Sequence, residues 1–78
     1  MSLTEAARGA EALEACLEDL DELIAGLDRY APTVVAVALR THLEALLQAL
    51  LESRQCSAVE VRDFLRELER EALQYETE

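Results

Sequence analysis

A long apolar run in the middle of the chain most constrains the fold. Residues 34–51 read VVAVALRTHLEALLQALL, and the polar members are only Arg40, Thr41, His42, Glu44 and Gln48. A helix that packs on one neighbour needs an apolar stripe about 100° wide. At about 100° per residue, the apolar side chains of this run cover about twice that arc. A helix here must therefore be covered from at least two sides, and surplus apolar surface is a candidate partner site.

The composition predicts an all-α fold in one small domain, residues 1–78. Hydrophobic residues make up 51% of the chain and charged residues 31%, with only two Gly and one Pro, which excludes a disordered chain. A domain of 78 residues buries a smaller fraction of its surface than a larger one, so oligomerisation often adds stability. All seven basic residues are arginine, which we interpret as the mark of a GC-rich, bacterial coding sequence.

The charge and the absence of targeting signals point to a cytoplasmic protein. The net charge of −10 repels nucleic-acid phosphate and anionic membranes, so neither is an expected partner. The start of the chain, MSLTEAARG, is polar and unlike a signal peptide. Arg40, His42, Glu44 and Gln48 interrupt the apolar run, so we expect no membrane span. Cys16 and Cys56 are too few for a disulfide framework, and free thiols are favoured over a single bridge between them.

The spacing of apolar residues predicts a first helix over residues 3–28. Ser2 and Glu5 have the spacing of a capping box. Gly9 lowers the stability of a helix interior by about 1 kcal/mol, Gly26 is a candidate C-terminal cap, and Pro32 ends the helix. The apolar positions alternate steps of three and four, which is a heptad seam. They are Leu3, Ala6, Ala10, Leu13, Leu17, Leu20, Ile24 and Leu27.

Two further helices are predicted, over residues 33–52 and 58–75. Ser57 and Glu60 form a second capping box, which places Cys56 just before the third helix. Short connections favour antiparallel neighbours, so we expect an up-down-up three-helix bundle. The second helix has apolar surface beyond the needs of such a bundle, which favours a homodimer formed through the first two helices. The residues predicted at that interface are Val34, Val37, Leu47 and Leu51.

Few residues suggest chemistry. His42, the single histidine, has no second histidine with which to complete a zinc site. Cys56 precedes a helix whose dipole favours a thiolate, so it is a candidate reactive thiol, although a half-buried staple residue is the simpler interpretation. We find no nucleophile–base pair and no glycine-rich loop. The sequence therefore predicts no catalysis, no bound metal and no cofactor.

The first helix carries a strongly acidic face, which is either a solvated surface or a docking face for a basic partner. The leading prediction is a small, non-catalytic protein–protein interaction module that forms homodimers. One alternative is an acidic inhibitor or adaptor that docks on a basic surface, as anti-CRISPR, antitoxin and anti-sigma proteins do. Another is a thiol or metal sensor that uses Cys16, His42 and Cys56. The residues of the acidic face are Glu11, Glu14, Glu18, Asp19, Asp21 and Glu22.

Overall fold

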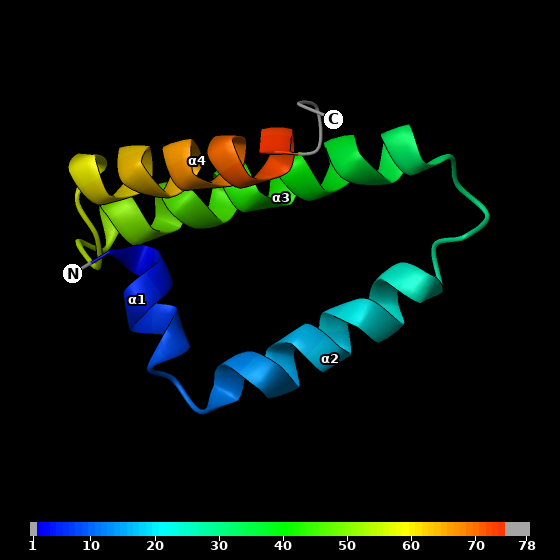
Figure 1. Ribbon diagram of the computed structural model, residues 1–78, viewed down its shortest axis with the longest axis horizontal. Helices are drawn as coiled ribbons and strands as arrows, with labels where there is room; N and C mark the ends of the chain where they lie inside the picture. The colour runs from blue at the N-terminus through cyan, green and yellow to red at the C-terminus, as the bar shows by residue number, and fades with distance from the viewer. Residues whose placement is uncertain (1, 75–78) are drawn as a thin grey trace.

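The computed structural model describes residues 2–74, which fold into helices joined by short turns (Figure 1). The helices are α1 (Leu3–Arg8), α2 (Ala12–Ala25), α3 (Pro32–Glu52) and α4 (Ala58–Leu73). Within these residues there is no strand, so the predicted all-α class is confirmed. The second and third predicted helices correspond to α3 and α4, and the predicted end of the third at Tyr75 lies outside the described residues.

The predicted helix over residues 3–28 is wrong, because this part of the chain forms two helices. The chain turns at Gly9 and Ala10, where hydrogen bonds to the third residue back replace the α-helical pattern: Ala10 N–H donates to Ala7 (3.0 Å) and Leu13 N–H to Ala10 (3.2 Å). Glycine is poorly suited to a helix interior. The heptad spacing continues across Gly9, so the apolar pattern alone does not reveal this change of direction. The second helix, α2, ends at Ala25.

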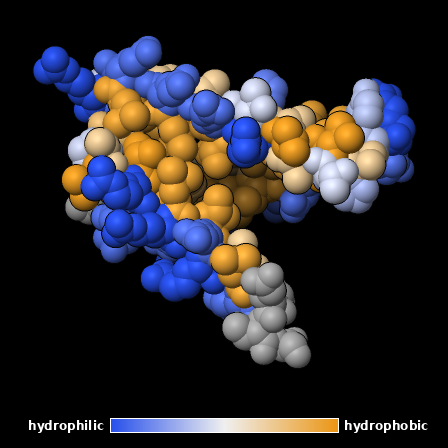
Figure 2. Space-filling model, turned by 90° about the horizontal axis from the view of Figure 1, so that it is seen from above, coloured by the Kyte–Doolittle hydropathy of each residue, from blue (hydrophilic) through white to orange (hydrophobic). Residues whose placement is uncertain are grey.

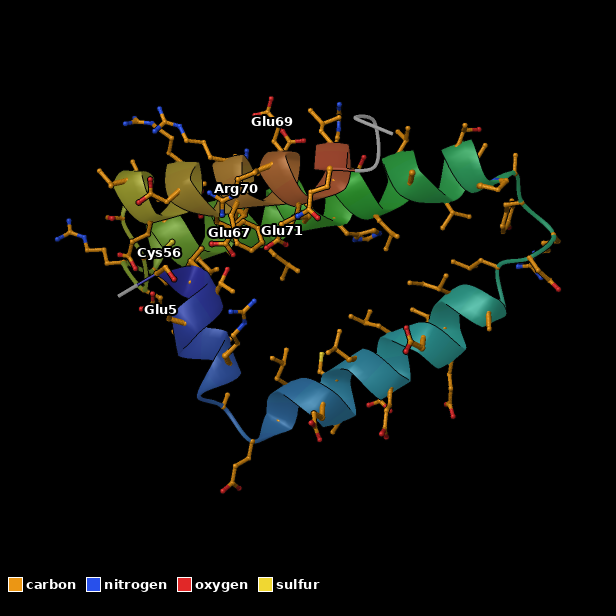
Figure 3. All side chains as sticks on the ribbon, viewed as in Figure 1. Glu5, Cys56, Glu67, Glu69, Arg70 and Glu71 are labelled. Atoms are coloured by element: carbon orange, nitrogen blue, oxygen red, sulfur yellow. The ribbon has the colours of Figure 1, made fainter. Side chains whose placement is uncertain are left out.

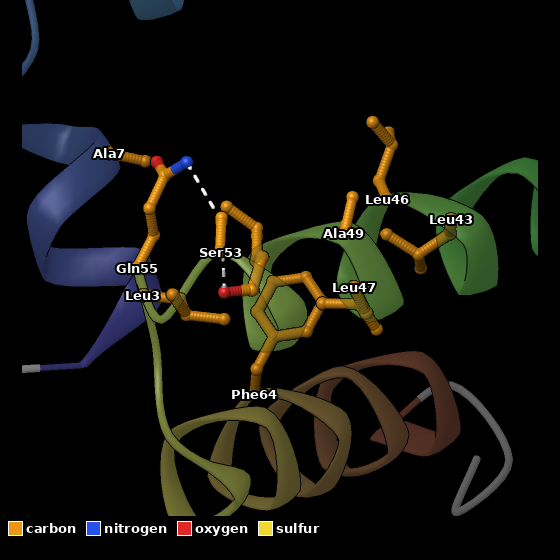
Figure 4. Close-up of a pocket in the computed structure, with 10 residues that line it drawn as sticks. Leu3, Ala7, Leu43, Leu46, Leu47, Ala49, Ser53, Gln55 and Phe64 are labelled. Atoms are coloured by element: carbon orange, nitrogen blue, oxygen red, sulfur yellow. Dashed lines mark hydrogen bonds between the residues drawn. The ribbon is translucent and has the colours of Figure 1, made fainter.

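The core lies at one end of the molecule, where α1 meets the end of α3 and the start of α4. Leu47 of α3 and Cys56 of the following turn are the buried hydrophobic residues among those described. Leu3 and Phe64 line a hollow beside Leu47 (Figure 4). Because Leu47 is only 9% exposed, it packs within its own chain and is not the free edge residue that we predicted.

The end of α3 is fixed by a Schellman motif with an unusual residue. Gln55 N–H donates to the Leu50 carbonyl (2.9 Å), and Arg54 N–H donates to that of Leu51 (3.1 Å). Arg54 has a φ of 60°, in the left-handed region that glycine normally fills at this position. The tight turn from α3 to α4 therefore requires a strained arginine backbone.

Replacing Arg54 by glycine is expected to raise the free energy of unfolding by about 0.5–1 kcal/mol, because glycine has no Cβ to strain this conformation. Urea denaturation monitored by circular dichroism measures the change. Arg54→Ala is the control, since alanine retains the Cβ. A stabilisation by alanine equal to that by glycine would show that loss of the arginine side chain, not relief of backbone strain, is responsible.

The start of α4 is a complete capping box, as predicted. The Ser57 hydroxyl accepts from Glu60 N–H (3.2 Å), and the Glu60 carboxylate accepts from Ser57 N–H (3.1 Å). Ser57→Ala removes one of these bonds and is expected to lower the free energy of unfolding by about 1 kcal/mol. Ser57→Asp, which keeps a capping oxygen, is the control in the same urea titration. Equal losses in both variants would contradict a capping role.

Candidate functional site: an open apolar groove

An apolar groove runs along α3, between α2 on one side and α4 on the other. Three hollows, of about 530, 550 and 490 Å³, follow one another along this helix. Neighbouring hollows share lining residues: Leu43 and Leu46 belong to the first two, and Ala36 and Leu39 to the second and third. The three hollows therefore form one continuous groove. Figure 2 shows apolar side chains gathered in this hollow and hydrophilic side chains along its rims.

The walls and floor of the groove are uncovered. Leu46, on the floor, is 63% exposed. Leu20 and Ile24 of α2 line the groove and are also exposed. Leu68 of α4 is exposed on the other wall. The apolar face of α2 thus stands off α3 instead of packing against it (Figure 1).

The single chain exposes more solvent-accessible surface than a compact folded monomer of the same mass. Folded monomeric proteins of 8.7 kDa expose about 4,700 Å², whereas this chain exposes 6873 Å². Its radius of gyration is 14.1 Å, against about 11.5 Å for a compact domain of this length. The chain therefore exposes about 2,100 Å² more than a compact monomer of its mass, and exposed apolar side chains along the groove are part of this surface.

The structure separates the four predicted interface residues. Val34 and Val37 are more than half exposed, but they line a shallow hollow with Thr33 and Ala38, apart from the groove. Leu51 is 37% exposed, and Leu47 is in the core. Leu39 and Leu46 of the groove are exposed but were not among the predicted interface residues, because helical periodicity identifies an apolar face without showing which chain covers it.

The acidic face lies on α2 and on the turn before it. All six carboxylate residues are exposed, and within residues 2–74 none of their carboxylate groups forms a hydrogen bond or an ion pair. The carboxylates lie on the side of α2 opposite Leu20, which lines the groove. In α4, Glu69 points away from α3 (Figure 3). The carboxylates of the acidic face thus lie away from the groove.

The candidate chemical groups are not brought together. Cys56 is buried and Cys16 is exposed; Cys56 lies in the turn at the same end of the molecule as Glu5 (Figure 3). His42 lines the middle of the groove. Among the described residues, no group of three or more His, Cys, Asp or Glu could hold a metal ion. The described residues therefore present an apolar groove, with Cys16, His42 and Cys56 at separate places.

By length and composition, α3 could cross a membrane, and it is the one helix of the described part that passes this test. Arg40 and Glu44 lie near its centre. A charged side chain at the middle of a bilayer costs about 2.5–3.5 kcal/mol. The long apolar arc of α3 is also the floor of a concave groove, a shape that fits a convex partner.

The chain matches no protein-family model, no curated protein and no solved structure in comparisons with known proteins.

Proposed function

We propose that this protein is a non-catalytic helical interaction module that works as a homodimer in the cytoplasm. The observation that supports it is the row of exposed apolar side chains along the groove, among them Leu20, Leu46 and Leu68, on a chain with about 2,100 Å² more surface than a compact monomer of its mass. Exposed apolar patches on monomers rarely exceed a few hundred Å². Contact with a second copy would place these side chains in a core.

The size of the excess fits a dimer. Obligate homodimers bury about 2,000–5,000 Å² in total. If each of two chains covered its excess, the interface would bury about 4,200 Å². In such a dimer the two chains would together build the helical bundle that one chain leaves open, with α2 and α3 from each copy in a common core.

Co-expression of two copies with different affinity tags tests self-association in the cell. Purification through one tag is expected to recover the second copy in comparable amount. An unrelated acidic helical protein carrying the second tag is the control for non-specific capture. Recovery of one tagged copy alone, with both present in the lysate, would contradict the homodimer.

Salt is expected to strengthen the dimer. Each chain carries a net charge of −10, so two copies repel, and added salt screens this repulsion. The dissociation constant is expected to fall by about fivefold between 50 and 500 mM NaCl, measured by sedimentation equilibrium. A dimer held mainly by opposite charges would weaken over the same range.

A second candidate function uses the acidic face as a docking surface for a basic partner, in the manner of an inhibitor or adaptor. It is supported by the six exposed carboxylates of α2 and the preceding turn, which have no ion-pair partner within residues 2–74. The test is a triple reversal of Asp19, Asp21 and Glu22 to arginine in a tagged pull-down from the native cell. Loss of a captured protein supports docking through this face, whereas capture equal to that of wild type would discard it.

A further inference from the structure

The groove is long enough to hold one helix of this same chain. Along α3 it extends from Pro32 to Leu50, a rise of about 27 Å. The second helix, α2, has 14 residues and is about 21 Å long. A guest helix as long as α2 would therefore fill most of the length of the groove.

The chemistry of α2 also matches the groove. Its apolar residues Leu17, Leu20, Leu23 and Ile24 are exposed, and Leu20 and Ile24 line the groove. Its opposite face carries the carboxylates, which would stay in water when the apolar face is buried. Laying an amphipathic helix in an apolar groove is a common mode of helix recognition.

We infer that α2 of a second copy seats in the groove above α3, between α2 and α4, and that each copy fills the groove of the other. This arrangement rests on the proposed dimer and specifies its interface. Because the same groove and the same helix occur in both copies, a two-fold axis makes the exchange reciprocal and closed. The common core would contain α2 and α3 of both chains.

The charges at the rim of the groove are compatible with α2 of a second copy as its occupant. Arg40 lines the groove between Leu39 and Leu43 and has no ion-pair partner within the described part of the chain. A second α2 would bring its carboxylates to this rim, beside the guanidinium. A lipid surface fits less well, because the site is concave and the chain is strongly acidic.

The test compares two glutamate substitutions on α3. Leu46 and Val37 are similarly exposed, at 63% and 59%. They are nine residues apart, two and a half turns, and so lie on opposite sides of the helix.

Leu46→Glu puts a charge on the groove floor and is expected to raise the dissociation constant of the dimer by about 100-fold. Val37→Glu is expected to leave it unchanged. Light scattering gives the masses, and circular dichroism checks that the helices form.

The outcomes distinguish this inference from the proposed function. A wild-type chain that is monomeric in solution would overturn both the homodimer and the seating of α2 in the groove. A chain that stays monomeric and binds phosphatidylcholine vesicles in a flotation assay would also overturn both. A wild-type dimer that survives Leu46→Glu would overturn the groove assignment and leave the dimer intact. Loss of the dimer in Val37→Glu would equally overturn the groove assignment.

The native thiols provide a second measurement if Leu46→Glu fails to fold. Cys16 is exposed in the single chain and lies on α2, and Cys56 is buried. Seating α2 in a groove is expected to slow alkylation of Cys16 by iodoacetamide about tenfold in concentrated wild-type protein relative to dilute protein. A rate for Cys16 that does not depend on protein concentration, across the range in which the mass doubles, would contradict burial of α2.

Discussion

Replacing Leu47 by alanine is expected to lower the free energy of unfolding by about 3 kcal/mol, the largest effect of a single substitution in this chain. Leu47 is 9% exposed, and truncating a buried leucine removes apolar contacts and leaves a cavity. In a domain with few buried side chains, a loss of this size is a large part of the total stability. Urea denaturation at a fixed protein concentration measures it.

Leu51→Ala is the matched control for this substitution. Leu51 lies one turn further along α3 and is 37% exposed, so truncation is expected to cost about 1 kcal/mol. Equal losses at the two positions would indicate that Leu47 is not the centre of the core of a single chain. A much larger loss at Leu51 would instead place that residue in an interface.

The melting temperature is expected to rise with protein concentration. Folding that includes association is stabilised by mass action, by about 1.4 kcal/mol for each tenfold increase in concentration. For a dimer of two such chains this corresponds to a rise of about 3–5 °C per tenfold. Calorimetric scans at 5 and 500 µM would measure it, and Leu46→Glu provides the control with little or no shift. A wild-type melting temperature that is constant over this range would contradict obligate association.

Helix boundaries that depend on local chemistry could be predicted from the sequence. The capping box at Ser57, the proline that opens α3 and the all-helical composition are local signals, and they place α3 and α4 closely. The break at Gly9 was harder to predict, because its cost of about 1 kcal/mol is small beside the packing that decides whether a helix continues. The arginine with positive φ at position 54 had no sequence signal, since glycine or asparagine is usual there.

The candidate site could be predicted only in outline. The wide apolar arc of the second predicted helix correctly indicated that α3 has surplus apolar surface. It did not identify the exposed residues, because the angle around a helix says nothing about which neighbours are present. Leu47 was predicted at the surface and lies in the core, whereas Leu46, its neighbour in sequence, is open to the groove. The direction of α2 decides this difference, and that direction depends on the turn at Gly9.

The mass of the protein in solution tests the central claim most directly. Light scattering at about 50 µM, well above the dissociation constants typical of stable homodimers, is expected to give twice the chain mass of 8.7 kDa. Val37→Glu is expected to give the same mass, and Leu46→Glu the mass of one chain. A wild-type mass of one chain at this concentration would contradict the homodimer and the exchange of α2 helices together.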